Sequence, residues 1–192
     1  MMMPAGQLIL VVGPSGAGKD TLIDYARARL GAEPNIHFVR RVINRALGPG
    51  EIHEPVDDTE FDRRLGAGQF ALHWEAHGHR YGIPIRIDER LDRGHTVVAN
   101  GSRAILSGAR EKYPNLLAVN VSVSADILAQ RLAKRGRESH DAIKNRLLRS
   151  DQLSFDRLNV LEIDNSKTLE IGGERLVAII TGFDAAKTAS AE

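Results

Sequence analysis

Short apolar runs alternate with amphipathic stretches along most of this 192-residue chain. Continuous apolar segments rich in Val and Ile are typical of strands that are buried on both faces of a parallel sheet. We expect such strands at residues 7–12, 36–43, 95–101, 116–123 and 159–165. Since the stretches between them have the period of a helix, the pattern predicts an α/β fold, in which a parallel five-stranded sheet is flanked by helices.

The helices and one further element follow from the same pattern. Residues 69–84 alternate loosely around Gly78 and Gly82, which predicts a hairpin. The first helix should pack on the sheet through one apolar face, formed by Leu22, Ile23, Ala26 and Leu30. The expected helices cover residues 20–30, 57–68, 84–93, 104–113, 124–136, 137–153 and 169–180.

The composition narrows the classes of protein. Apolar residues make up 42% and charged residues 27%, as in a soluble globular protein, and the net charge of +1 favours neither nucleic acid nor a membrane as a partner. The absence of cysteine excludes disulfides, thiolate metal sites and cysteine catalysis, and it fits a cytoplasmic location. No apolar run approaches the ~18–20 residues of a membrane-spanning helix. We expect no signal peptide at residues 1–12, because they lack a basic segment.

The first strand leads into the sequence GPSGAGKDT, which has the G-x-x-x-x-G-K spacing of a phosphate-binding loop. Its glycines let backbone N–H groups turn toward a phosphate, and the helix that follows adds its positive end. Lys19 would reach the outer phosphates. We therefore expect ATP and Mg²⁺ to bind here. The candidate ATP-binding residues are Gly13, Pro14, Ser15, Gly16, Ala17, Gly18, Lys19, Asp20 and Thr21.

Asp20 stands where this motif normally has the Ser or Thr that binds Mg²⁺. A carboxylate can ligate Mg²⁺ directly or through water, and Thr21 offers a hydroxyl one residue later. An acid in the first turn of a helix also interacts favourably with the helix dipole, without any metal contact. Both interpretations of Asp20 remain open, and Asp20 and Thr21 are the candidate metal residues.

Arginines gather in two parts of the chain. Arg41 and Arg45 follow the second expected strand, and Arg131, Arg135 and Arg146 surround a turn near residue 138. Isolated surface arginines are usually solvated, and we predict this for Arg131. Arg135 and Arg146 flank a turn between two helices, which can close like a lid and bring guanidinium groups onto a transferring phosphoryl group. The candidate catalytic residues are Lys19, Arg135 and Arg146.

Further polar candidates lie in the hairpin and after the strand at residues 95–101. The hairpin has three histidines, but their spacing fits no common zinc signature. We expect contact with phosphate or hydroxyl groups for some of them and plain surface placement for the rest. Tyr81 is either a phosphate donor or a half-buried aromatic. Asn100 follows a strand where parallel sheets bind ligands, although a helix capped by Ser102 is an alternative. The candidate substrate-binding residues are Arg41, Arg45, His73, Tyr81, Asn100 and Arg103.

These motifs resemble the guanylate kinase group of nucleoside monophosphate kinases, in the same order and over nearly the whole chain. The matching segments are GPSGAGK, YG at Tyr81–Gly82, RLAKRG at 131–136, NRL at 145–147 and IDN at 163–165. Arg45 and the GE pair at 50–51 resemble that family's substrate-phosphate loop. The resemblance implies one P-loop kinase domain with a substrate-binding insert and a short lid. Its expected parts are a core (7–34 and 95–181), a substrate-binding region (about 36–84), a lid (about 135–146) and a flexible tail (182–192).

The residues that would read guanine are missing. The family's second phosphate-loop arginine is replaced by Gly48, its guanine-reading acid falls on Leu72, and its hydroxyl residue after YG is Ile83. A site built to hydrogen-bond guanine would not have apolar groups at both of the last two positions. The segments GKD, VINRA, LHWEAHGHRYG and NGSRA instead resemble the related ribose 1,5-bisphosphate phosphokinase family, in which an aspartate at position 20 is normal.

This second resemblance implies transfer of the ATP γ-phosphate to the 1-phosphate of ribose 1,5-bisphosphate, with 5-phosphoribosyl 1-diphosphate as product and a role in phosphonate breakdown. Two alternatives stay open. One is a kinase for GMP or another small phosphate acceptor. The other is a non-catalytic guanylate-kinase-like binding module, although such modules typically lose the loop lysine and lid arginines, which are present here as Lys19, Arg135 and Arg146.

Overall fold

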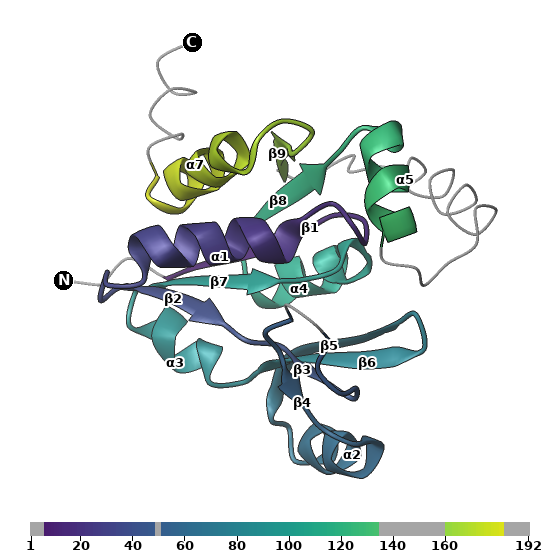
Figure 1. Cartoon of the computed structure of the whole chain (residues 1–192). Coiled ribbons are helices and arrows are strands. Elements are labelled where there is room, and N and C mark those ends of the chain that lie inside the picture. The colour runs from purple at the N-terminus through teal and green to yellow at the C-terminus, as the bar shows by residue number, and fades with distance from the viewer. Residues whose placement is uncertain (1–5, 49–50, 135–159, 183–192) are drawn as a thin grey trace.

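The computed structural model describes residues 6–48, 51–134 and 160–182. Its main element is the predicted five-stranded parallel sheet, and the structure shows that its strand order is β2-β7-β1-β8-β9 (Figure 1). The strands are β1 (Gln7–Val12), β2 (Ile36–Val39), β7 (Thr96–Asn100), β8 (Leu116–Ser122) and β9 (Val160–Asp164). β1 is central, and five of its six residues are buried.

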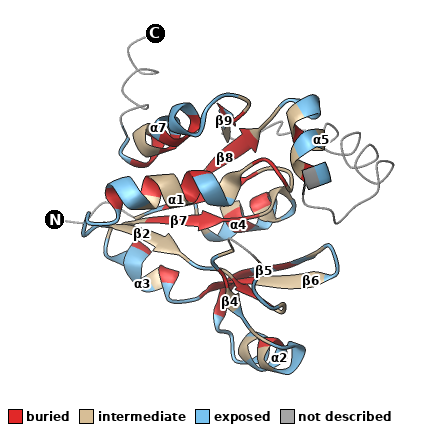
Figure 2. Ribbon diagram, viewed as in Figure 1, coloured by how far each residue is buried: buried red, intermediate tan, exposed pale blue. Residues whose placement is uncertain are grey.

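Helices cover both faces of this sheet. α1 (Lys19–Leu30) and α7 (Leu169–Ile180) lie together on one face, and the predicted apolar face of α1 is buried there. α3 (Ile87–Asp92) and α4 (Leu106–Lys112) pack on the other face. Side chains of β1 alternate between these two cores, and the central strands β1, β7 and β8 are mostly buried (Figure 2). α5 (Ala125–Lys134) follows β8, and a short 3-10 helix η1 (Arg103–Ile105) precedes α4.

A second, four-stranded sheet projects from the carboxyl ends of the main strands (Figure 1). Its order is β4-β3-β6-β5, with β3 (Val42–Ile43), β4 (Glu54–Pro55), β5 (Phe70–Ala76) and β6 (His79–Pro84). β5 and β6 form the predicted hairpin, whose two turn residues His77 and Gly78 both have positive φ. Such a turn matches the twist of the flanking strands. α2 (Asp58–Gly66) lies at the far end and is capped by the side chain of Asp57.

One predicted strand is wrong. Residues 36–43 form two strands in different sheets, because β2 pairs with β7 whereas β3 pairs with β6. The apolar pattern continues across this change of partner and therefore does not reveal it. The second sheet accordingly begins after Val39. The expected lid and the expected helix at 137–153 lie outside the described residues. No helix in the described part of the chain is both long and apolar enough to span a membrane.

Candidate active site

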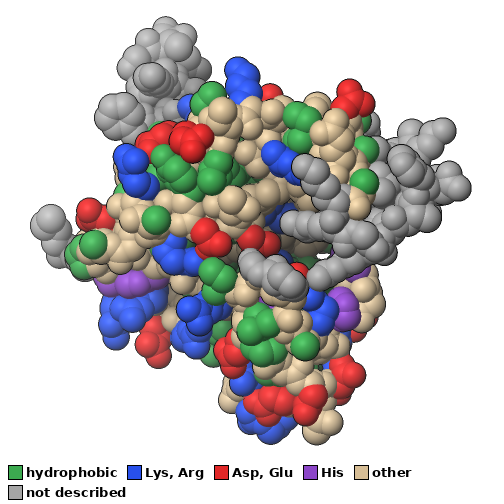
Figure 3. Space-filling model, in the orientation of Figure 1, with side chains coloured by type: hydrophobic (Ala, Val, Ile, Leu, Met, Phe, Trp, Pro, Cys, Tyr) green, Lys and Arg blue, Asp and Glu red, His purple; other side chains and the backbone are tan. Residues whose placement is uncertain are grey.

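A cavity lies at the carboxyl ends of the main strands, between the phosphate loop and the second sheet. Four segments line it: the loop after β1, the β3–β4 region, the β5–β6 hairpin and the end of β7. Acidic and basic side chains both occur on the face between α1 and the second sheet (Figure 3). The sequence-predicted residues that line the cavity are Gly13, Ser15, Gly16, Gly18, Lys19, Asp20, Thr21, Arg41, Arg45, Tyr81 and Asn100.

The phosphate loop has a backbone that requires glycine. Gly13, Gly16 and Gly18 have φ values of 138°, 91° and 92°, which side chains rarely permit. A Cβ atom on Gly13 would lie 2.3 Å from the carbonyl oxygen of Val121. α1 begins at Lys19, so its N-terminal N–H groups face the cavity and favour an anion there. The strand, loop and helix thus have the arrangement that phosphate binding needs.

Lys19 lies over this loop. Its Nζ donates hydrogen bonds to the carbonyl oxygens of Gly13 and Pro14, both at 2.9 Å. These two bonds hold the ammonium group at the mouth of the loop, where a phosphate oxygen would meet it. The position fits the predicted role of Lys19 as the cation for the outer phosphates.

Two residues hold the phosphate loop in place through hydrogen bonds to its backbone. Asn165 Nδ2 donates to the carbonyl oxygen of Ala17 at 2.7 Å, and Arg131 Nη1 donates to the same oxygen at 3.3 Å. Because C=O and N–H point in opposite directions in a trans peptide, these bonds fix the direction of the Gly18 N–H. The prediction of a solvated Arg131 is wrong. Arg131 belongs to the RLAKRG segment and Asn165 to the IDN segment. Membership of these segments was the signal that could have identified both residues as supports of the loop.

Asp20 connects the phosphate loop to the opposite side of the cavity. Its Oδ1 accepts a hydrogen bond from Asn100 Nδ2 at 2.6 Å and faces Arg41 Nη2 at 3.4 Å. The side chain of Asp20 is 63% exposed, whereas that of Arg41 is 17% exposed. Burial lowers the pKa of the Arg41 guanidinium, and the charge of Asp20 opposes that shift.

The oxygen donors at this point suit Mg²⁺. Asp20 offers a carboxylate, Thr21 an exposed hydroxyl, and Asn100 a buried Oδ1 that has no hydrogen-bond partner. Mg²⁺ prefers oxygen ligands and is usually held by one or two carboxylates together with substrate phosphates. Since no three His, Asp or Glu side chains gather within the described ranges, a magnesium ion here would depend on nucleotide phosphates for its other ligands. The residues present fit such an ion.

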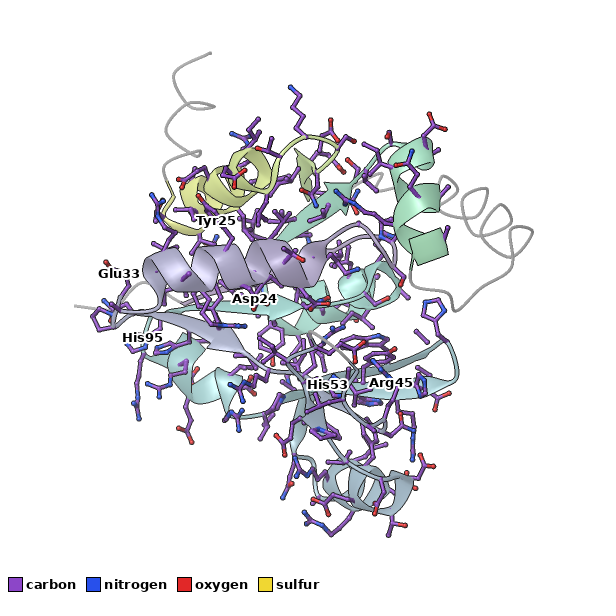
Figure 4. All side chains as sticks on the ribbon, in the orientation of Figure 1. Asp24, Tyr25, Glu33, Arg45, His53 and His95 are labelled. Carbon is purple, nitrogen blue, oxygen red and sulfur yellow. The ribbon has the colours of Figure 1, made fainter. Side chains whose placement is uncertain are left out.

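A second ion pair organises the loop between β3 and β4. Arg45 Nη1 lies 2.8 Å from Glu51 Oε2, and the same oxygen accepts the Gly48 N–H at 2.9 Å. Buried His53 lies beside Arg45 (Figure 4), with Nε2 3.0 Å from the Arg45 carbonyl oxygen. Burial raises the pKa of the Glu51 carboxyl, but the hydrogen bonds from Arg45 and Gly48 outweigh this effect and hold the pKa below its ordinary value of 4.5.

Aromatic rings form the wall opposite the phosphate loop. Trp74 and Tyr81 are cross-strand partners on β5 and β6, and their rings stack with centroids 5.3 Å apart. The Arg41 guanidinium lies 5.6 Å from the centre of the Tyr81 ring, within the range of a cation–π contact. The stack fixes both Tyr81 and Arg41 against the cavity.

Two residues further along the hairpin, Leu72 pairs with Ile83, and these are the two positions expected to read guanine in a guanylate kinase. Both side chains are buried in the apolar core that covers one face of the main sheet. Neither belongs to the residues that line the cavity. The place of the two guanine-reading groups is therefore occupied by hydrophobic packing.

Two predicted substrate residues are not brought to the cavity. His73 is exposed on β5 and lies between two neighbours in the strand, Leu72 and Trp74, that face the interior, so it points the other way. His77, at the hairpin turn, lines the cavity instead. Arg103 follows the lining residue Ser102, but its charge acts on Glu162 of β9, where it opposes the burial that raises the pKa of that carboxyl. The predicted catalytic residues Arg135 and Arg146 lie outside the described residues.

Solved structures with this fold include several kinases. The chain matches a guanylate kinase from Anaplasma phagocytophilum with a TM-score of 0.71 and 20% identity, over 95% of this chain and 88% of that one. It matches a gluconokinase from Sinorhizobium meliloti with a TM-score of 0.54 and 19% identity, over 100% of both chains. At this level of identity the likeness shows a shared fold, which confirms the predicted fold class.

Curated relatives are much more similar in sequence, although no protein-family model matches the chain. A protein from Thiobacillus denitrificans named ribose 1,5-bisphosphate phosphokinase PhnN is 45% identical over 190 residues, which cover 98% of this chain and 100% of that protein. A protein of the same name from Brucella melitensis is 48% identical over 85% of each chain. A bifunctional ribose 1,5-bisphosphokinase-thymidine phosphorylase from Cupriavidus pinatubonensis is 45% identical over 91% of this chain and 29% of that protein. The chain therefore belongs to the ribose 1,5-bisphosphate phosphokinase family.

Proposed function

We propose that this protein transfers the γ-phosphoryl group of MgATP to the 1-phosphate of ribose 1,5-bisphosphate, and so forms 5-phospho-α-D-ribose 1-diphosphate and ADP. The observation that carries the proposal is a contrast between the phosphate-binding parts of the site and the positions that would read guanine. The phosphate loop and its cations are retained, whereas the guanine-reading positions Leu72 and Ile83 are a buried apolar pair. Membership of the phosphokinase family supports the same acceptor.

The donor side has the parts that phosphoryl transfer needs. The N–H groups of the loop and the start of α1 would hold the nucleotide phosphates, and Lys19 would neutralise charge that develops on the transferring group. Asp20 and Thr21 would hold Mg²⁺, which would offset the negative charge of the nucleotide phosphates. Arg135 and Arg146 remain the predicted lid cations for this step.

The acceptor side would hold a doubly phosphorylated sugar. Arg41, Arg45 and Tyr81 line the wall that faces the loop and would bind the acceptor phosphates, while Asn100 would meet a ribose hydroxyl. An oxygen of the 1-phosphate attacks the γ-phosphorus, the bond from that phosphorus to the bridging oxygen breaks, and ADP leaves with the electron pair. Because the attacking oxygen is already anionic near neutral pH, no general base is required. Catalysis would consist of positioning and charge neutralisation.

A product assay tests this proposal. The full chain is incubated with MgATP and ribose 1,5-bisphosphate, and phosphorus NMR follows the appearance of a diphosphate at position 1 of the sugar. We expect 5-phosphoribosyl 1-diphosphate and ADP in equal amounts from the parent, and little product from the matched Lys19→Ala variant. Binding of ATP without any turnover would instead favour a non-catalytic binding module.

A further inference from the structure

Asp20 touches groups on the acceptor side of the cavity, in addition to its place at the phosphate loop. Its Oδ1 accepts the Asn100 amide at 2.6 Å and faces the Arg41 guanidinium at 3.4 Å. The Ser or Thr that usually occupies this position is neutral and could not serve as the counter-ion of an arginine. The aspartate therefore joins the metal-binding position to two candidate acceptor ligands.

We propose that Asp20 couples the two substrates, so that the acceptor binds tightly only when a magnesium–nucleotide complex is present. The inference rests on the proposed function, which supplies the two substrates. While Asp20 faces Arg41, its negative charge offsets that of the guanidinium and repels an acceptor phosphate. When the carboxylate of Asp20 turns to a magnesium–nucleotide complex, Arg41 and the amide of Asn100 become available to the acceptor.

Burial indicates which of the three side chains moves. Arg41 is 17% exposed at its side chain and is fixed against the Tyr81 ring, and Asn100 is 5% exposed. Asp20 is 63% exposed and belongs to the first turn of α1. A rotation of the short Asp20 side chain is therefore enough to exchange its partners, while the two acceptor ligands stay in place.

The orphaned atom of Asn100 supports the same exchange. Asn100 Oδ1 is buried and has no hydrogen-bond partner, although its Nδ2 is bonded to Asp20. A buried polar atom without a partner costs free energy unless a ligand satisfies it. Release of Nδ2 by Asp20 would give Asn100 a donor and an acceptor for a substrate at the same time.

Arg41, Arg45 and Tyr81 form the wall opposite the phosphate loop, called here the acceptor wall. Its other arginine, Arg45, has a separate counter-ion. Arg45 pairs with Glu51 at 2.8 Å, and Glu51 also accepts the Gly48 N–H, so this pair belongs to its own loop. Neither of these two contacts involves Asp20. We therefore expect the coupling to depend on Asp20 and not on Glu51.

The single tryptophan of the chain provides a way to measure the coupling. Trp74 lines the cavity and stacks on Tyr81, so its fluorescence should report acceptor binding. Ribose 1,5-bisphosphate is titrated into the full chain alone, with a non-hydrolysable ATP analogue and Mg²⁺, and with the same analogue and EDTA. Calorimetry gives the same affinities independently of the fluorescence. In the parent protein we expect acceptor affinity to rise about 10-fold with the magnesium complex, a typical coupling between two sites, and much less with EDTA.

Two variants separate the charge of Asp20 from a general effect. Asp20→Asn keeps the size of the side chain and removes its charge, so acceptor affinity without nucleotide should rise and the effect of the magnesium complex should fall to within about 2-fold, below the usual range of coupling. Asp24→Asn removes the same charge one turn later on α1, where Asp24 pairs with Arg27, and should keep the coupling of the parent.

The outcomes distinguish this inference from the proposed function. Equal acceptor affinity with and without the magnesium complex in the parent would overturn the coupling and leave the proposed function intact. Undiminished coupling in Asp20→Asn would overturn the role of Asp20. A complete lack of acceptor binding under every condition would contradict the proposed function, and the coupling with it.

Discussion

The phosphate loop and the acceptor wall face each other across one cavity, yet they are built by different means. The loop depends on backbone: three glycines with positive φ and one carbonyl held by Asn165 and Arg131. The wall depends on side chains of a second sheet, where Arg41 and Arg45 each lie beside a carboxylate. The conformation of the loop depends on the backbone and hence on the fold. The chemistry of the wall depends on individual side chains and can change with single substitutions. The fold itself is shared with proteins named guanylate kinase and gluconokinase.

The largest effect should come from the cation of the loop. Lys19→Ala removes charge neutralisation at the transferring group, so we expect kcat to fall about 10²-fold or more, with the protein still folded. Steady-state kinetics with saturating MgATP and acceptor measure this loss. Lys167→Ala, which removes an exposed lysine after β9, is the control. Turnover near that of the parent in Lys19→Ala would remove the lysine from the chemical step.

A change in the backbone of the loop should also be severe. Gly18→Ala would place a Cβ 2.5 Å from Asn165 Nδ2, in a residue with a φ of 92°, so we expect weaker nucleotide binding and a protein that is less stable by about 1–3 kcal/mol. Gly66→Ala on α2 is the matched control, since no atom lies within 4 Å of its Cβ. Equal ATP affinity in the two variants would show that the loop does not depend on backbone conformation.

The acceptor wall should respond differently. Arg45→Ala removes a candidate phosphate ligand but leaves the loop intact, so we expect KM for ribose 1,5-bisphosphate to rise about 10-fold, as for the loss of one charged hydrogen bond, with a smaller rise in KM for ATP. Initial rates at varied concentrations of each substrate give both constants. Arg63→Ala, on the exposed face of α2, should change neither. The opposite ranking of the two constants in Arg45→Ala would place Arg45 on the donor side.

The smallest effect concerns stability and pH. The pKa of Glu51 lies below its ordinary value of 4.5, so the pairing with Arg45 stabilises the protein above that pH and is lost as the pH falls below it. Glu51→Gln should therefore lower Tm at pH 7 by about 2–4 °C, the shift for ~1 kcal/mol in a chain of this size. The difference in Tm between Glu51→Gln and the parent should become smaller as the pH falls below 4.5. A difference independent of pH, or one equal to that of the exposed Glu75→Gln, would count against a stabilising ion pair.

The sequence predicted the strand, glycine loop and helix of residues 7–30 well because their signals are local. A buried strand, a glycine loop and an amphipathic helix follow each other within residues 7–30, and each has its own pattern. Lys19 and Asp20 take their places from this order alone. The structure adds their partners, and the contact of Asp20 with Asn100, 80 residues away, could not be inferred from spacing.

The acceptor side was harder to predict because it depends on which way a side chain faces. His73 and His77 lie in the same hairpin, but His73 points away from the cavity within β5, whereas His77 occupies the turn and lines the cavity. Arg131 resembles any surface arginine until the loop carbonyl beside it is known. The pattern of apolar residues gives no warning of such tertiary contacts, since it reports burial and not partners.

The central claim is that loss of guanine contacts marks a sugar phosphate as the acceptor. The most direct test is the ratio of kcat/KM for ribose 1,5-bisphosphate to that for GMP, measured with MgATP in parallel reactions. Because the polar edge of guanine would meet no partner at Leu72 and Ile83, we predict a ratio of at least ~10² in favour of the sugar. A ratio near or below one, with GDP as a main product, would contradict the account and identify the protein as a divergent guanylate kinase.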